Sequence, residues 1–110
     1  MSDEFKIDYL IVEEDRPSHI LKHDVTIGEV SEIISNDYIY IQAKYGRWQL
    51  IGKTRKNRFL TIIVGNRSKK NTYGLVTARP ASKKERDFYK EFTFQLKSEE
   101  YNYGKKQNNN

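Results

Sequence analysis

The sequence has no cysteine, only two prolines among 110 residues, and no long apolar run. Without cysteine there are no disulfides, thiolate zinc sites or cysteine nucleophiles, so apolar packing must hold the core in either redox compartment. No run approaches the roughly 18 apolar residues of a membrane span, and the first residues do not resemble a signal peptide. We therefore expect a soluble, cytoplasmic protein with a single domain at residues 1–100 and a flexible polar tail at 101–110.

Acidic side chains are nearly missing from the middle of the chain. Residues 1–43 carry ten acids and three bases, a net charge of −7, whereas residues 44–90 carry fourteen bases and two acids, a net charge of +12. The last twenty residues balance at zero. This segregation favours a polyanionic partner for the basic half, and a solvated lysine-rich surface is the plain alternative.

The first 37 residues predict one strand and two helices. β-Branched and aromatic residues favour a strand over residues 5–13. A proline in the first turn favours a short helix over residues 17–23, with Asp15 as its cap. Thr26 and Glu29 have the spacing of a capping box at the start of a second helix. The apolar residues that follow have helical spacing: Ile27, Val30, Ile33 and Ile34.

Residues 38–79 predict an antiparallel meander of three sequential strands. The first has an alternating segment at residues 38–43 and a second at residues 47–54, with a turn or bulge near Gly46 between them, because unbroken alternation would place the apolar residues on opposite faces. The second, residues 59–64, is apolar on both faces and is therefore predicted to be central. The third covers residues 72–79 and ends before Pro80.

A third helix is predicted after the sheet. Ser82 and Glu85 form a second capping box, and an apolar stripe follows at helical spacing. The expected fold class is therefore α+β, with a small antiparallel meander sheet packed by two N-terminal helices and one C-terminal helix. The stripe consists of Phe88, Tyr89, Phe92 and Leu96.

Cations on or beside the meander are the first candidate site. Alternation places Arg47, Gln49 and Lys53 on one solvent-facing side of a strand. The same rule groups Arg79 with Thr77, Leu75 and Tyr73, and Arg58 enters the middle strand at its start. Converging guanidinium groups suit bidentate contact with phosphate, and isolated surface ion pairs are the alternative.

Two histidines, His19 and His23, are spaced i, i+4 on the short helix. A zinc site is disfavoured, because the chain has no other histidine and no cysteine, so a third ligand would have to be a carboxylate. A surface or hydrogen-bonded histidine pair is the plainer interpretation, and His23 or Lys22 acting at a phosphate is another. Since residues 44–84 hold no acid, a metal-dependent nuclease is disfavoured too. RNA needs no metal-bound nucleophile, because it supplies its own 2′-hydroxyl.

Several short blocks occur in an order that resembles the BrnT family of toxins, within the RelE-like superfamily of type II toxin–antitoxin ribonucleases. The family pattern runs roughly K-H-G-V, E-R-x-x-x-I-G, R and S-A-R-x-A-x-x-x-E-R-x-x-Y. The resemblance covers about residues 18–92. The matching blocks here are His23-Asp24-Val25-Thr26, Gly46-Arg47-Trp48-Gln49-Leu50-Ile51-Gly52-Lys53-Thr54, Arg58-Phe59-Leu60, Thr77-Ala78-Arg79-Pro80-Ala81 and Glu85-Arg86-Asp87-Phe88-Tyr89.

The resemblance implies a RelE-like fold, metal-independent cleavage of RNA with no cofactor, and a cognate antitoxin that masks the site. A homo-oligomer or a toxin–antitoxin hetero-oligomer is the expected assembly. Carried over by position, the catalytic candidates are Lys22 and His23 on the K-H pair, Arg47, Arg79 and Tyr89. The RNA-binding candidates are Lys53, Arg58 and Arg86.

In the leading hypothesis Arg47 and Arg79 clamp the scissile phosphate, while Lys22, His23 or Tyr89 transfers protons. Glu85 matches the last block as well, and its plainer interpretation is that of a helix cap. An alternative function is a non-catalytic nucleic-acid-binding or regulatory module on the same fold. This alternative is favoured because Gly46 stands where the family pattern has Glu. A third hypothesis is a structural partner whose basic half docks an acidic protein.

Overall fold

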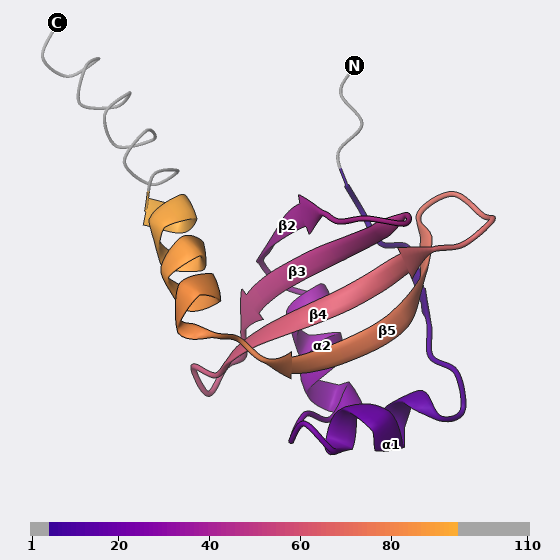
Figure 1. Cartoon of the computed structure of the whole chain (residues 1–110), viewed down its shortest axis with the longest axis horizontal. Helices are drawn as coiled ribbons and strands as arrows, with labels where there is room; N and C mark the ends of the chain where they lie inside the picture. The colour runs from indigo at the N-terminus through magenta and orange to yellow at the C-terminus, as the bar shows by residue number, and fades with distance from the viewer. Residues whose placement is uncertain (1–4, 95–110) are drawn as a thin grey trace, which may run out of the picture.

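The computed structural model of the protein describes residues 5–94. Within them, five strands form one sheet and two helices precede the second strand (Figure 1). After β5 another helix begins at residue 83 and is described to residue 94; we call it the C-terminal helix. The elements are β1 (Tyr9–Ile11), α1 (Arg16–Leu21), α2 (Ile27–Ile34), β2 (Tyr38–Gln42), β3 (Arg47–Lys53), β4 (Phe59–Asn66) and β5 (Thr72–Pro80).

The sheet has the order β1-β5-β4-β3-β2, and β2 to β5 form an antiparallel meander as predicted. The meander has four strands and not three, because a tight turn fully separates β2 from β3. At this turn Tyr45 and Gly46 both have positive φ, 61° and 69°. Such backbone favours glycine, so Gly46 breaks the strand at the predicted position. The apolar β4 is the middle strand, which confirms its predicted place.

The first strand is much shorter than predicted. Of the predicted strand only β1 pairs with the sheet; it lies beside β5 and parallel to it, so the sheet is mixed and not purely antiparallel. Phe5 lies outside the strand and packs by its ring against other aromatic side chains, with centroids 4.6 Å from Trp48 and 5.0 Å from Tyr73. Side-chain packing therefore takes the place of backbone pairing at the start of the described chain.

The helices begin close to the predicted positions. Asp15 is the N-cap residue of α1, but its carboxylate binds the Arg16 guanidinium at 3.0 Å and caps no helix N–H. Asp15 therefore stands at the predicted cap position, but its side chain makes no capping hydrogen bond. The capping box of α2 is confirmed, since Glu29 N donates to Thr26 Oγ1 at 3.2 Å and Thr26 N donates to Glu29 Oε1 at 3.0 Å.

The sheet has two distinct faces. One face, which we call the helical face, packs against α1 and α2, and α2 passes behind the strands in Figure 1. The opposite face, which we call the site face, meets the C-terminal helix, whose Tyr89 packs against a small cluster of Ile39, Ile51 and Ala81. The main core lies on the helical face and includes Ile20, Val25, Val30, Ile33, Leu50, Leu60, Ile62, Val64, Leu75 and Ala78.

A β-bulge in β5 decides which side chains reach the site face. Ile63 pairs with Thr77 while its neighbour Val64 pairs with Leu75, so Val76 is an extra residue. The extra residue reverses the alternation, and Leu75 packs into the core of the helical face. The predicted grouping of Arg79 with Leu75 and Tyr73 is therefore wrong, whereas Thr77 and Arg79 do share a face.

Two further expectations concern the ends of the chain and membranes. The predicted tail at residues 101–110 and the stripe residue Leu96 lie outside the described residues. Among the helices of residues 5–94, none is long and apolar enough to cross a membrane.

Candidate functional site

The centre of the site face is an ion pair between Arg79, near the end of β5, and Glu85, in the first turn of the C-terminal helix. Arg79 Nη1 lies 2.8 Å from Glu85 Oε1, and Nη2 lies 2.8 Å from Oε2. This bidentate geometry is the strongest form of a carboxylate–guanidinium contact. Pro80 ends the strand, and the second predicted capping box holds the helix start, with Glu85 N 3.2 Å from Ser82 Oγ and Ser82 N 2.9 Å from Glu85 Oε1.

Glu85 also joins the helix to the middle of the sheet. Its carboxylate accepts hydrogen bonds from Gln49 Nε2 of β3 at 2.7 Å and from Thr61 Oγ1 of β4 at 2.8 Å. The hydrogen bonds from Arg79 are the main reason that the pKa of Glu85 falls from 4.5 to about 2. A single carboxylate thus sits on the otherwise basic face and stays ionised at any physiological pH.

Beside this network, α1 contributes an imidazole to the site face. His19 Nε2 lies 3.1 Å from Thr77 Oγ1, and Thr77 precedes Arg79 by two residues on the same face of β5. Arg16 fixes the helix to the strand, because its Nη1 donates to the Val76 carbonyl at 2.6 Å. The His19–Thr77 contact and the Arg79–Glu85 pair therefore lie next to each other on β5, and we call these four residues the β5 cluster.

The other catalytic arginine predicted from the sequence lies away from this cluster. Arg47 begins β3, four residues before Ile51, and Ile51 pairs with the Thr61 that also pairs with Arg79. Strand geometry therefore separates Arg47 from Arg79 by about 13 Å along the sheet and about 10 Å across it. The two arginines are on the same face, but they do not converge on one phosphate without movement of their side chains.

Lys53 and Tyr89 lie on the opposite side of the Arg79–Glu85 pair from Arg47. Lys53 Nζ is 5.8 Å from the centroid of the Phe59 ring, and the Tyr89 ring stacks edge-on against that ring at 5.5 Å. Burial is the main reason that the pKa of Tyr89 is raised, and the negative charge of Asp37 raises it further. Arg86 donates to the Ala81 carbonyl at 2.9 Å and so helps to hold the start of the C-terminal helix.

Lys22 and His23 follow α1 and are exposed. The His23 ring lies 5.6 Å from the His19 ring, edge to face, so the two histidines form a pair as the spacing allows. His19 is half-buried and is the member of this pair that contacts the sheet.

Arg58 lies apart from the site face. Its guanidinium binds Glu29 at 2.8 and 3.0 Å and Asp24 at 3.3 Å, so it joins β4 to the start of α2. Burial raises the pKa of Glu29, but hydrogen bonds from the Thr26 backbone and from Arg58 outweigh burial and lower it. The predicted convergence of Arg58 with Arg47, Lys53 and Arg79 does not occur.

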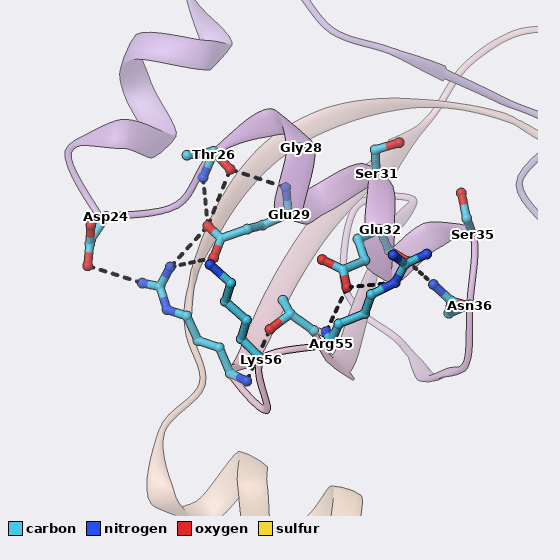
Figure 2. Close-up of a pocket in the computed structure, with 12 residues that line it drawn as sticks. Asp24, Thr26, Gly28, Glu29, Ser31, Glu32, Ser35, Asn36, Arg55 and Lys56 are labelled. Atoms are coloured by element: carbon cyan, nitrogen blue, oxygen red, sulfur yellow. Dashed lines mark hydrogen bonds and ion pairs between the residues drawn. The ribbon is translucent and has the colours of Figure 1, made fainter.

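Figure 2 shows a hollow of the surface between α2 and the β3–β4 turn, with a volume of about 820 Å³. Arg55 from the β3–β4 turn faces Glu32 of α2 across it, and the Arg55 backbone N–H donates to the Glu32 carboxylate at 2.6 Å. The acidic and basic side chains that line this hollow compensate one another, which makes it a poor site for a polyanion. The lining residues are Asp24, Thr26, Gly28, Glu29, Ser31, Glu32, Ser35, Asn36, Thr54, Arg55, Lys56 and Arg58.

The described part of the chain has no cluster of side chains that could bind a metal ion. Across residues 5–94, no three side chains of His, Cys, Asp and Glu lie close enough together to hold an ion. The polar groups described on the site face are guanidinium, ammonium, imidazole, carboxylate, amide and hydroxyl groups.

The sequence had singled out His19 only as half of a histidine pair and Glu85 mainly as a cap. The signals for the β5 cluster were nevertheless present. Gln49 was predicted to share the polar face with Arg47, and a capping-box glutamate close behind a strand-ending Arg79-Pro80 can reach back to the sheet. The hydroxyl partners Thr61 and Thr77 carry no pattern that distinguishes them from ordinary strand threonines.

No protein family and no curated protein matches this sequence. The structure, however, is similar to the crystal structure of the Brucella abortus ribonuclease toxin BrnT, with a TM-score of 0.53 and 20% sequence identity. The similarity covers 73% of this chain and 100% of that one. This chain has a BrnT-like fold.

The resembling blocks lie at defined places in this fold. One block precedes α2, the second is β3 with its leading turn, and the third begins β4. The last two are the end of β5 and the start of the C-terminal helix, where Arg79 meets Glu85. The α+β class expected from the sequence is confirmed.

Proposed function

We propose that this protein is the toxin of a type II toxin–antitoxin pair and acts as an endoribonuclease. The observation that carries this proposal is the structural similarity to a ribonuclease toxin over the whole of that toxin's chain. The sequence supports it through the resembling blocks and through a net charge of +12 over residues 44–90. RNA is the substrate class, because a basic face without a metal site suits a polymer that supplies its own nucleophile.

Arg79 is the residue we assign to the scissile phosphate. Its guanidinium lies in the middle of the site face, and the side chain remains 40% exposed although Glu85 binds it. A guanidinium has five N–H donors, of which Glu85 takes one on each of the two terminal nitrogens, so a phosphate can share the guanidinium or displace the carboxylate. Stabilising the extra charge of the phosphorane is the largest single contribution that such a group can make.

The remaining cations flank this point. Arg47 and Lys53 extend the basic face in opposite directions along β3 and would hold neighbouring phosphates, and Arg86 lies close to the start of the C-terminal helix. Lys22, His23 and Tyr89 stay the candidates for proton transfer that the resemblance implies. Arg58 is proposed as a structural residue, since Glu29 and Asp24 compensate its charge.

The proposed protein partner is a cognate antitoxin that masks the site face. An acidic segment would complement the exposed cations of this face and exclude RNA by occupying the same charges. The expected assembly is a hetero-oligomer of toxin and antitoxin, or a homo-oligomer of the toxin alone.

The test is the integrity of RNA after expression in bacterial cells. Wild type should degrade cellular RNA and arrest growth, and Arg79→Ala should reduce cleavage at least 100-fold. Lys69→Ala removes one positive charge from the exposed loop between β4 and β5 and serves as the matched control. Intact RNA with folded wild type, or equal cleavage by wild type and folded Arg79→Ala, would contradict the assignment.

A non-catalytic nucleic-acid-binding module is the second candidate. Two observations favour it, namely Gly46 in place of the family glutamate and the closed ion pair that occupies Arg79. Such a module would bind RNA with a strong salt dependence, losing about 10³ to 10⁵ in affinity between 50 and 200 mM salt for six to ten phosphate contacts, yet leave it uncut. A flat salt response would contradict both candidates.

A further inference from the structure

His19 is the one imidazole that the fold places on the site face. It is half-buried between α1 and β5, and its Nε2 contacts the hydroxyl of Thr77 at 3.1 Å. Thr77 and Arg79 project from the same side of β5, about 7 Å apart along the strand. An imidazole, an alcohol and a phosphate-binding guanidinium are thus adjacent on a single rigid strand and the helix fixed to it.

Contacts between α1 and the sheet hold His19 in a fixed position. Arg16 ties the helix to the Val76 carbonyl at 2.6 Å, and Ile20, next to His19, is fully buried in the core. The orientation of the ring is therefore set by backbone and core contacts and by Thr77, and not by a flexible loop. A preorganised acid–base group on a regular element is what general acid–base catalysis requires.

The contact with Thr77 also indicates what the ring can bind. A threonine hydroxyl is an alcohol, and the ribose 2′-hydroxyl of RNA is an alcohol as well. A 2′-hydroxyl that took the place of Thr77 Oγ1 at Nε2 would stand beside a phosphate held by Arg79. Imidazole is the side chain whose ordinary titration falls between pH 5 and 8, so it can accept a proton under cellular conditions.

We propose that His19 is the general base of the reaction; the inference rests on the proposed endoribonuclease function. Nε2 of the neutral ring takes the proton of the 2′-hydroxyl while the 2′-oxygen attacks phosphorus. The P–O5′ bond breaks, and the 5′-oxygen takes a proton from water. The products are a 2′,3′-cyclic phosphate and a 5′-hydroxyl, and the imidazolium returns its proton to solvent, so no metal or cofactor enters the balance.

The groups that face His19 are few. Asp15, His23 and Thr77 lie close to it, Arg16 is on the same helix, and Arg79 is two residues from Thr77 on β5. The ordinary pKa values of Asp, Glu, Tyr, Lys and Arg side chains all lie outside pH 5 to 8, so a limb of the pH–rate profile in this range points to a histidine. Separate substitution of His19 and of His23 shows which of the two histidines causes this limb.

The experiment compares purified wild type with His19→Gln and His19→Ala on a mixed-sequence RNA labelled at its 5′ end. Glutamine can keep a hydrogen bond to Thr77 but cannot act as a base, so His19→Gln should fold like wild type and cleave 10²- to 10⁴-fold more slowly. Its pH–rate profile should also lose the limb between pH 5 and 8. Leu21→Ala, an exposed change on the same helix, is the control and should leave the rate unchanged.

The outcomes separate the two proposals. If wild type cleaves and folded His19→Gln cleaves equally fast with the same pH profile, His19 only fixes α1 to β5 and the inference is overturned, while the endoribonuclease function stands. If His23→Ala alone removes the limb, His23 is the base and the inference again fails. If folded wild type leaves the RNA intact, both the function and the inference are overturned.

Discussion

Arg79 and Glu85 form a closed ion pair at the centre of the site face, with both of their nitrogen–oxygen distances at 2.8 Å. Glu85 is at the same time the capping residue of the C-terminal helix and a hydrogen-bond acceptor for Gln49 and Thr61. The Glu85 carboxylate thus holds the start of the C-terminal helix and accepts hydrogen bonds from side chains of three strands. It also occupies the Arg79 guanidinium, which we assign to phosphate. RNA binding at Arg79 has to compete with this internal anion.

The Arg79–Glu85 ion pair predicts that the folded protein loses stability in acid. The folded protein lowers the pKa of Glu85 from 4.5 to about 2, so it favours the ionised carboxylate. The resulting stabilisation is fully present above about pH 4.5 and is lost as the pH falls through about 2. We expect it to contribute about 1 to 3 kcal/mol to the free energy of unfolding at pH 7.

Glu85→Gln should therefore be less stable than wild type at pH 7, and the difference should shrink steadily between pH 4.5 and 2. Urea unfolding at pH 7, 4, 3 and 2 measures it. Glu14→Gln, at an exposed position, is the matched control. A difference between Glu85→Gln and wild type that stayed constant over this range would contradict the account of the pair.

Arg58 is expected to affect stability and not RNA binding. Its side chain is 30% exposed and joins Glu29 across 29 residues of sequence. Arg58→Ala should lower the free energy of unfolding by about 1 to 3 kcal/mol, because it leaves a half-buried carboxylate with fewer partners. The control is Arg55→Ala, whose 89% exposed side chain should contribute less than about 0.5 kcal/mol.

Chemical denaturation and RNA titration of Arg58→Ala and Arg55→Ala show whether Arg58 contributes to stability or to RNA binding. A stable Arg58→Ala protein with clearly weakened RNA binding would return Arg58 to the phosphate-binding role that its sequence position suggested.

Two glycines should respond to alanine in opposite directions. A Cβ at Gly52 in β3 would lie 2.6 Å from Ile33 Cγ2, so Gly52→Ala should overpack the contact between sheet and α2 and cost about 1 to 3 kcal/mol. A Cβ at Gly28 in α2 meets only Thr26 Oγ1 at 3.7 Å. Gly28→Ala should therefore stabilise the protein by about 0.5 to 1 kcal/mol through helix propensity. Thermal unfolding checks both, and a stabilised Gly52→Ala would disprove the packing described for α2.

The exposed cations of β3 should appear in the salt dependence of RNA binding. Arg47→Ala and Lys53→Ala should each lower the slope of log affinity against log salt by about 1, whatever the RNA sequence. Lys69→Ala, on a loop beyond the site face, should leave the slope unchanged. Fluorescence titration between 50 and 200 mM salt measures these slopes, and three equal slopes would argue against an RNA path along β3.

The elements that the sequence predicted well are those with local causes. Both capping boxes form as expected, Thr26 with Glu29 and Ser82 with Glu85, because their partners are three residues apart. The turn at Gly46 follows from strand alternation and from backbone that glycine tolerates. The early strand was predicted too long because its packing, with Phe5 among aromatic rings, involves distant residues.

Charge segregation along the chain predicted a basic face but not which of its cations are paired. The acidic first half and the basic second half partly compensate each other in space, since Glu29 and Asp24 bind Arg58 and Glu13 binds Arg67. Net charge per segment cannot anticipate such pairs, because their partners are decided by packing.

The sequence by itself determined the α+β order, the two capping boxes and a basic sheet face, since each depends on neighbours along the chain. Only the tertiary structure decided which cations are free and which groups meet. The bulge at Val76 turns Leu75 into the core and leaves Thr77 with Arg79, and packing of α1 brings His19 to that strand. Such long-range contacts follow from burying apolar surface on both sides of the sheet, which no local spacing encodes.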